Sequence, residues 1–213
     1  IDCNMQSPAD MLSPGRIGMT AILPVRFTAM KWYGKGPLET YPDRQCGGRM
    51  GVYSEDVRNQ PFYLRPQEYG LHTESRSMRL TDPDRADFVR FEAACPMAMS
   101  AVPYSDLQLW NARHPLELPA PEALYVHLDY AHRGLGNSSC GPDVLPTYRI
   151  DDRPCRFGFA LEAGLGEQED NPFGPIPEEI PAYHPWKAVG ERDRTPSYRD
   201  PSDPDQRSNA GMV

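Results

Sequence analysis

Residues 124–130 read Leu-Tyr-Val-His-Leu-Asp-Tyr, with a large apolar side chain at every second position. Because successive side chains of a β-strand point to opposite faces of a sheet, this period of two predicts a half-buried strand. The expected core face carries Leu124, Val126, Leu128 and Tyr130. We expect the opposite face, with Tyr125, His127 and Asp129, to be wet.

Further strands are predicted on both sides of this one. Period-two apolar sets occur in 17–23 (Ile17, Met19, Ala21, Leu23) and 157–161 (Phe157, Phe159, Leu161), and 88–91 and 97–102 are two more candidates. Asp82-Pro83-Asp84 and Cys95-Pro96 are turn signals.

One helix start is convincing. Ser105 and Gln108 form a capping box, and Tyr104 and Leu109 a hydrophobic staple, with Pro115 ending the helix soon after. The chain is therefore predicted to be nearly all β.

The composition narrows the possible classes of protein. Pro contributes 24 of 213 residues, more than twice the average usage, which argues against a helical bundle. The net charge of −8 and the lack of a basic stripe exclude a nucleic-acid binder. No apolar run is long enough for a membrane helix, so we expect no membrane partner. The chain begins with Ile1, without an initiator Met, which suggests a processed chain or a fragment.

The chain divides by composition after residue 163. Residues 164–213 hold eight Pro, five Gly, and ten acidic against five basic residues, with few large aliphatic side chains. Such a segment buries too little surface to offset its ordering entropy, so we expect a disordered tail. The alternative is a docking arm anchored by Tyr183, Trp186 and Tyr198.

The cysteines point to a reducing compartment. The five lie far apart at Cys3, Cys46, Cys95, Cys140 and Cys155, and no CxxC pair exists. A zinc site is therefore not expected, and reduced thiols favour a cytoplasmic protein.

Three carboxylates stand in distinctive stretches and could serve a glycosidase. A retaining enzyme needs two carboxylates about 5–5.5 Å apart, and Glu39, Asp43 and Glu68 are candidates. The alternative is that each caps a turn or pairs with a neighbouring Arg44 or Arg65, and we prefer it.

Two other kinds of site have weaker support. His127 and Asp129 point the same way on a strand and, with His132 nearby, could resemble metal ligands, but no third ligand close to that pair is evident, so we expect no metal site in this chain. No GxSxG nucleophile elbow, GxxxxGK[ST] or GxGxxG motif occurs.

The stretch 32–44 reads Trp-Tyr-Gly-Lys-Gly-Pro-Leu-Glu-Thr-Tyr-Pro-Asp-Arg. Its flat rings could stack on sugars or belong to the core. Further blocks follow in order: Tyr-Leu-Arg-Pro-Gln-Glu-Tyr-Gly at 63–70, His-Pro-Leu-Glu-Leu at 114–118, Leu-Asp-Tyr at 128–130, Gly-Leu-Gly at 134–136, Cys-Gly-Pro at 140–142 and Pro-Thr-Tyr-Arg at 146–149. Over 17–161 the chain resembles the C-terminal domain of glycoside hydrolase family 2 β-galactosidases.

The resemblance implies an antiparallel β-supersandwich, similar to galactose mutarotases, over residues 1–163, with one short helix and the disordered tail 164–213. It also implies that the chain corresponds to about the later half of the family's C-terminal domain. The chain would then be either a fragment or a natural small subunit. In the family this domain closes over a separate (β/α)8 barrel, in cis or in trans, which holds two catalytic Glu and the magnesium and sodium sites. No catalytic residue and no cofactor is therefore expected in this chain.

The resemblance also implies a site and a function. The loop holding Asn137, Ser139 and Cys140 corresponds to the rim of the galactose pocket, with Cys140 where relatives usually place a Trp. The full enzyme would be an oligomer that hydrolyses terminal β-D-galactose, as in lactose, by a retaining route, while the isolated chain would be inactive.

Two alternatives from other classes stay open. One is a stand-alone carbohydrate-binding module. The other is an aldose 1-epimerase-like enzyme, which would need a His–carboxylate pair, with His72 and Glu68 as the candidates.

Overall fold

The computed structural model describes residues 1–5, 13–60, 68–136, 141–150 and 154–166. Eight strands and one short α-helix dominate these ranges. The strands are β1 (Asp2–Met5), β2 (Arg16–Pro24), β3 (Ala29–Gly36), β4 (Arg49–Asp56), β5 (His72–Thr81), β6 (Phe88–Val102), β7 (Ala123–His132) and β8 (Cys155–Gly164). The helix is α1 (Asp106–Asn111), and 3-10 turns span Val57–Asn59, Pro115–Glu117 and Pro146–Tyr148.

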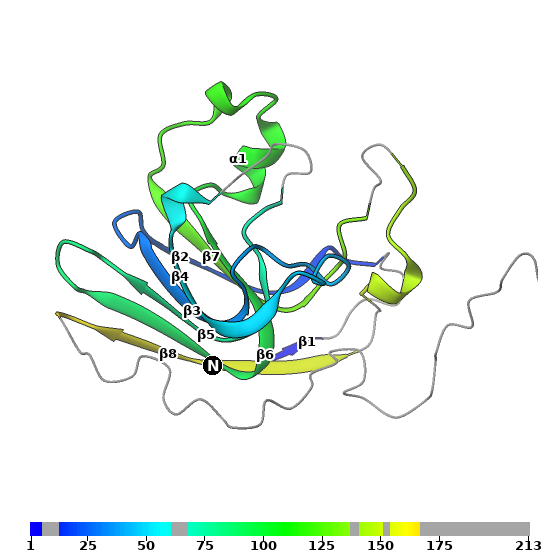
Figure 1. Cartoon of the computed structure of the whole chain (residues 1–213), viewed down its shortest axis with the longest axis horizontal. Helices are drawn as coiled ribbons and strands as arrows, with labels where there is room; N and C mark the ends of the chain where they lie inside the picture. Colours follow the sequence, from blue (N-terminus) through cyan, green and yellow to red (C-terminus); the bar gives the residue numbers. More distant parts are fainter. Residues whose placement is uncertain (6–12, 61–67, 137–140, 151–153, 167–213) are drawn as a thin grey trace, which may run out of the picture. The chain divides into compact units, whose positions relative to one another are not determined.

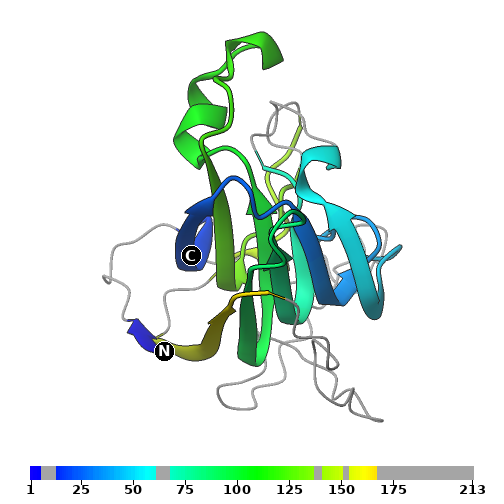
Figure 2. The same cartoon turned by 90° about the vertical axis from the view of Figure 1, so that its left-hand side faces the viewer.

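All strand pairs are antiparallel. The order β1-β8-β6-β5-β3-β4 forms one path, while β7 pairs with β6 and β2 pairs with β7. The strands curve around a common interior, and α1 projects beyond the ends of β6 and β7 (Figures 1 and 2). This confirms the expected all-β, sandwich-like fold with one short helix.

The apolar core is built from the inward faces of these strands. Leu124 and Val126 are fully buried and Leu128 is almost so, as the alternation in β7 predicts. They pack with side chains from β2, β3, β5, β6 and β8, among them Ile17, Trp32, Met78, Phe91 and Phe157. One member of each of two predicted apolar sets lies outside the core, since Met19 and Leu161 are 37% and 50% exposed.

Strand β6 organises the sheet because it has two different neighbours along one edge. Residues 88–93 pair with β8 and residues 98–102 pair with β7, while β5 pairs along the other edge. The predicted turn Asp82-Pro83-Asp84 is confirmed, as these residues connect β5 to β6.

The second predicted turn, Cys95-Pro96, is wrong, because both residues lie inside β6. The register between β5 and β6 shifts in the stretch between Glu92 and Met97. Proline has no N–H to donate, so a strand tolerates it where the hydrogen-bond ladder is already interrupted. The two predicted strands, 88–91 and 97–102, are therefore one strand that changes partner near Pro96.

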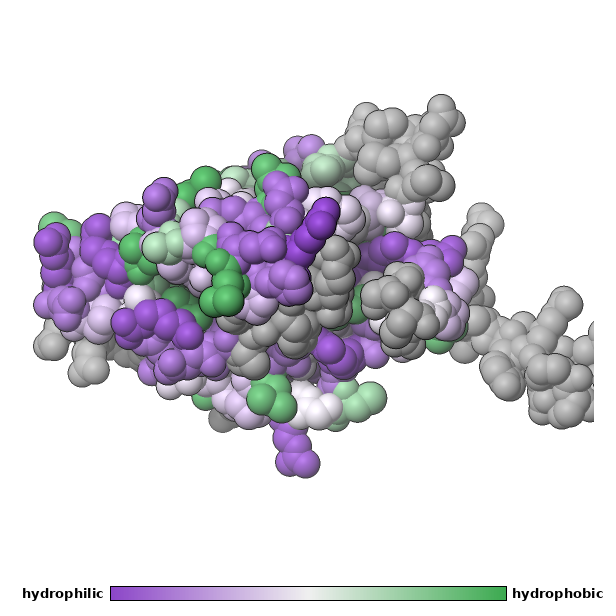
Figure 3. Space-filling view, turned by 90° about the horizontal axis from the view of Figure 1, so that it is seen from above, coloured by the Kyte–Doolittle hydropathy of each residue, from purple (hydrophilic) through white to green (hydrophobic). Residues whose placement is uncertain are grey.

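The predicted helix start is confirmed. The Ser105 side chain accepts a hydrogen bond from the Gln108 N–H, and Gln108 Oε1 accepts one from the Ser105 N–H at 2.8 Å. Leu109 is buried, and Tyr104 packs against the same small apolar cluster. The outer face of α1 is different, because Leu107 and Trp110 are each about two-thirds exposed. In the view from above, hydrophobic residues form separate patches among hydrophilic ones on the surface (Figure 3).

The described residues cover two further expectations, on the cysteines and on the tail, only in part. The described cysteines Cys3, Cys46, Cys95 and Cys155 are all free thiols, as expected, and Cys140 lies outside the described residues. Gly164, the first residue of the predicted tail, is still part of β8 and pairs with Phe88 of β6, and residues 167–213 lie outside the described ranges. No α-helix in those ranges is both long and apolar enough to cross a membrane.

Candidate functional site

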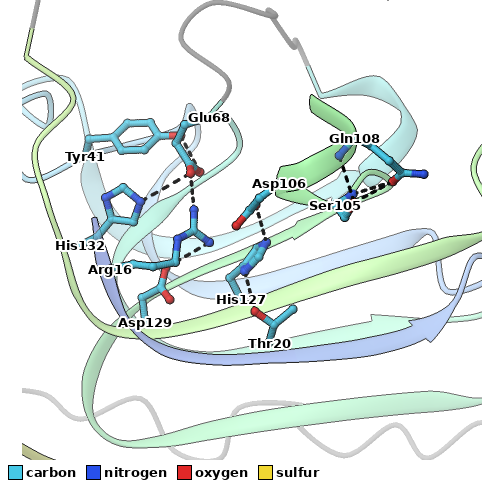
Figure 4. Close-up of polar contacts among 10 residues, drawn as sticks. All are labelled: Arg16, Thr20, Tyr41, Glu68, Ser105, Asp106, Gln108, His127, Asp129 and His132. Carbon is cyan, nitrogen blue, oxygen red and sulfur yellow. Dashed lines mark hydrogen bonds and ion pairs between the residues drawn. The ribbon is translucent and has the colours of Figure 1, made fainter. Parts of the chain in front are cut away.

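A group of polar side chains lies on the face of β7 opposite the apolar core. We call this group, which consists of Arg16, Tyr41, Glu68, Asp129 and His132, the polar cluster (Figure 4). Arg16 Nη2 donates a short hydrogen bond to Glu68 Oε2, and Tyr41 Oη donates to Glu68 Oε1 at 3.5 Å. His132 Nε2 lies 3.6 Å from Glu68 Oε2. Glu68 is therefore the common partner of three side chains from three separate segments.

The polar face of β7 is buried, which corrects the expectation of a wet face. His127 and Asp129 are 3% and 1% exposed. His127 Nδ1 lies 3.0 Å from Thr20 Oγ1, and His127 Nε2 lies 3.6 Å from Asp106 Oδ1 on α1. Strand β2 and α1, both remote in sequence, thus contribute polar partners on this face. No group of three or more possible metal ligands occurs among the described residues.

Glu68 is held in its ionised form. Burial alone acts to raise the pKa of this carboxyl, but the hydrogen bond from His132 and the positive charge of Arg16 together lower it below its usual value. A carboxylate with a lowered pKa is a poor general acid and a good anchor for cations. Glu68 therefore serves to hold Arg16 and His132 in place.

Burial shifts the pKa values of Asp129 and His127 toward the neutral form of each side chain. Burial raises the pKa of Asp129 to about 7, although Arg16 acts in the opposite direction. Arg16 Nη1 is 3.7 Å from Asp129 Oδ2, and this oxygen accepts no hydrogen bond from the described residues. Burial likewise lowers the pKa of His127 to about 4. In the folded chain the neutral form of Asp129 is therefore favoured below about pH 7, and that of His127 above about pH 4.

The raised pKa of Asp129 predicts a pH-dependent stability. Because the pKa rises from the ordinary 3.8 to about 7, the folded state retains a proton that the unfolded state has lost, so this group's stabilising effect falls as pH rises from about 4 to about 7. Asp129→Asn removes that dependence. We expect the unfolding free energy of the variant, relative to wild type, to rise by about 2 kcal/mol between pH 5 and pH 8.

Urea unfolding at four pH values between 5 and 8 measures this difference. Asp84→Asn, which changes an exposed carboxyl in the β5–β6 turn, is the control and is expected to follow the wild-type profile. A constant difference between Asp129→Asn and wild type across this range would mean that Asp129 is ionised throughout.

The alternation in β7 does not place His132 on the polar face, and a bulge explains why it lies there. Strict alternation places residue 132 on the core face with Leu128. Ile17 pairs with Ala131 but Gly18 pairs with Asp129, so Tyr130 is the extra residue of a β-bulge between β2 and β7. An extra residue exchanges the two faces for every position that follows. His132 therefore joins Asp129 on the polar face.

The rings of the 32–44 stretch belong to the core. Trp32, Tyr33 and Tyr41 are at most 4% exposed, and Trp32 stacks on His72 with 3.9 Å between ring centroids. These rings are thus not available as a sugar-stacking platform. His72, the candidate histidine of the epimerase alternative, thus stacks on Trp32, and the histidine beside Glu68 is His132.

The three candidate carboxylates each bind other groups within the chain. Glu39 pairs with Arg44, as expected, and Glu39 Oε2 also accepts from the Gly70 N–H at 2.8 Å. Asp43 accepts hydrogen bonds from the N–H groups of Leu135 and Gly136. Glu68 pairs with Arg16, while Arg65 lies outside the described residues.

The segment 39–44 thus connects parts of the chain that are far apart in sequence. Glu39 bonds to Gly70, Tyr41 contacts both Glu68 and His132, and Asp43 holds the Gly-Leu-Gly turn at 134–136. Three of the sequence blocks that carried the resemblance, those at 32–44, 63–70 and 134–136, therefore meet near the end of β7. The predicted rim residues Asn137, Ser139 and Cys140 follow this turn directly, but they lie outside the described residues.

Comparison with known proteins identifies the family. The family model described as beta galactosidase small chain matches residues 1–161. A β-galactosidase of Staphylococcus xylosus is 31% identical over 156 residues, which cover 72% of this chain and 16% of that protein. A β-galactosidase of Arthrobacter sp. (strain B7) is 35% identical (70% and 15% covered), and the β-galactosidase BgaC of Bifidobacterium adolescentis is 39% identical (68% and 14% covered).

The chain spans about a sixth of the length of these relatives. The matched region contains every strand of the fold up to residue 161, together with the polar cluster and the turn at 134–136. This chain belongs to the β-galactosidase small-chain family.

Proposed function

We propose that this chain is the C-terminal portion of a β-galactosidase and completes the sugar pocket of a catalytic (β/α)8 barrel, which is carried in cis or in trans. The assembled enzyme hydrolyses terminal β-D-galactose residues, as in lactose. The observation that carries the proposal is the family match over residues 1–161 in a chain that spans only about a sixth of its β-galactosidase relatives. The chemistry therefore lies with the remainder of the enzyme.

In this proposal the assembled enzyme follows a retaining route with two Glu residues of the barrel, one as nucleophile and one as acid/base. Glu39, Asp43 and Glu68 do not supply that pair, because each already binds cations or backbone N–H groups within the chain. The rim loop with Asn137, Ser139 and Cys140 borders the galactose pocket, and a cytoplasmic oligomer is the form we expect.

The magnesium and sodium ions that the resemblance implies do not fit this chain's described residues. Among those residues no group of three or more possible ligands comes together, and Arg16 already neutralises the carboxylate of Glu68. We therefore assign both ions to the barrel, and no part of this chain's role depends on binding them.

The isolated chain is predicted not to hydrolyse a chromogenic β-galactoside, because the proposal assigns the catalytic carboxylate pair to the barrel and the described candidates Glu39, Asp43 and Glu68 already bind cations or backbone N–H groups. The measurement is release of the chromogen by the purified chain, with the complete enzyme as positive control. Turnover that persists through purification and disappears in Glu39→Gln or Glu68→Gln would contradict the proposal. Sequencing the DNA 5′ of the Ile1 codon would then show whether a barrel is encoded in frame.

One observation favours the rival function of a stand-alone carbohydrate-binding module. Trp110 on α1 is 68% exposed, and an exposed ring can stack on a sugar. Calorimetric titration of the isolated chain with lactose separates the two functions. Our proposal expects no binding without the barrel, whereas binding that is lost in Trp110→Ala would favour the module.

The epimerase alternative has less support. An acid/base pair must leave room for a sugar between its members, whereas His132 and Glu68 contact each other. Arg16 and Tyr41 also donate hydrogen bonds to the Glu68 carboxylate. A test for mutarotation of galactose by the isolated chain is expected to show no catalysis.

A further inference from the structure

The exit from β7 is a turn held by a carboxylate from a distant part of the chain. Asp43 Oδ1 accepts a hydrogen bond from the Leu135 N–H at 3.1 Å, and Asp43 Oδ2 accepts one from the Gly136 N–H at 2.8 Å. Both oxygens of one side chain therefore bind two consecutive backbone N–H groups. Hydrogen bonds from N–H groups to an ionised acceptor are stronger than those between neutral groups.

The turn is shaped to receive this carboxylate. A Cβ at Gly134 would lie 2.7 Å from Asp43 Cγ and 2.7 Å from Val144 Cγ2, so a side chain there would displace Asp43 or Val144. Gly136 has a φ of +61°, and a Cβ there would lie 2.7 Å from the Val144 nitrogen. The Gly134 N–H also donates to the Tyr148 carbonyl at 2.9 Å.

The chain downstream of the rim loop is fixed independently. Asp143 accepts hydrogen bonds from Arg133 at 2.6 Å and from Arg149 at 3.1 Å, and Val144 is buried. Removing the Asp43 carboxylate would therefore loosen the Leu135–Gly136 side of the turn and leave the contacts of Asp143 intact. This separation allows a local effect on the turn to be distinguished from a general loss of folding.

We propose that Asp43 is a positioning residue of the assembled β-galactosidase: it fixes the turn Gly134–Gly136, which the proposed function places beside the galactoside. The inference rests on the proposed function, since it needs a sugar pocket beside this turn. Asp43 does not touch the reacting atoms. Its effect is on the ordering of the backbone before substrate binds.

The expected kinetic effect follows from that role. A rim contact acts equally on the bound substrate and on the transition state, so a loosened rim raises KM and changes kcat little. For Asp43→Ala in the complete enzyme we expect KM for an aryl galactoside to rise about fivefold with kcat within about twofold. Asp43→Asn retains one acceptor oxygen and should lie between Asp43→Ala and wild type.

The matched control is Glu39→Ala. Glu39 lies in the same segment and also accepts a backbone N–H, that of Gly70, but it does not contact the turn. The KM of the Glu39→Ala enzyme is expected to match that of the wild type. Amide exchange by NMR on this chain supplies an activity-independent readout, in which Asp43→Ala speeds exchange at Leu135 and Gly136 selectively.

The outcomes separate the two proposals. Fast exchange at Leu135 and Gly136 in the wild type would overturn the anchor itself, whatever the variants do. Faster exchange in Asp43→Ala with an unchanged KM would overturn the positioning role, as would failure of both Asp43 variants to fold. A complete wild-type enzyme that does not hydrolyse galactosides would instead overturn the proposed function, while the exchange result would still report on the anchor.

Discussion

Replacing Gly18 by alanine is expected to lower the unfolding free energy by about 3 kcal/mol, the upper end of the range for overpacking. Gly18 lies in β2 opposite Asp129 of β7, at the bulge between these strands. A Cβ there would lie 2.4 Å from the Leu128 carbonyl oxygen and 2.6 Å from Asp129 Cα. Because these are backbone atoms of the paired strand, the clash can be relieved only by separating β2 from β7.

The measurement is urea and thermal unfolding of the chain followed by circular dichroism, with a fall in Tm of roughly 10 °C expected for a unit of this size. Gly15→Ala is the control, because a Cβ at Gly15 would meet nothing within 4 Å. It is expected to change the unfolding free energy by less than about 0.5 kcal/mol. A loss below 1 kcal/mol in Gly18→Ala would show that β2 can move away from β7 without cost.

Sequence patterns predict those features of the fold that depend on residues close together in the chain. The alternation in β7 and the capping box at Ser105 depend on neighbours a few residues away, and both are confirmed. The turn expected at Pro96 is wrong because its outcome depends on strand pairing, which brings β8 and then β7 to the same edge of β6. A proline signal cannot distinguish a turn from a change of partner within one strand.

The polar cluster, like the pairing of β6, could not be predicted from local patterns. Composition allows His127 and Asp129 to be solvated, and only the fold places Arg16 of β2, Glu68 and α1 next to that face of β7. The bulge at Tyr130 then brings His132 to the polar side. What the sequence could predict was that Glu39, Asp43 and Glu68 bind Arg residues or cap turns, because these are the usual partners of carboxylates in loops.

Removing the carboxylate of Glu68 should be the most damaging single change to the polar cluster. Glu68→Ala leaves Arg16 with only the 3.7 Å contact to Asp129, and it removes the anionic partner of His132. The side chains of Arg16 and Glu68 are 22% and 18% exposed, so most of this pair is shielded from water. Breaking a buried pair from one side costs about 3–5 kcal/mol, and the partial exposure places our expectation near 3 kcal/mol.

A double-mutant cycle separates the ion pair from the loss of packing. Because an isolated charge is the main cost, Arg16→Met combined with Glu68→Met is expected to destabilise by clearly less than the sum of the two single changes. Glu92→Ala is the control, since Glu92 pairs with Arg90 while its side chain is 53% exposed, and its cost should stay below about 0.5 kcal/mol. Additive single changes would mean that Arg16 and Glu68 are not coupled.

The pH dependence supplies an independent check on Glu68. Because the pKa of Glu68 is lowered in the folded chain, its stabilising effect is present above the ordinary glutamate pKa and is lost as the pH falls through the folded value. The difference in unfolding free energy between wild type and Glu68→Gln should therefore shrink as the pH is lowered below about 4. Urea unfolding at pH 3, 4 and 7 measures it, and a difference that grows on acidification would show that Glu68 is protonated in the fold.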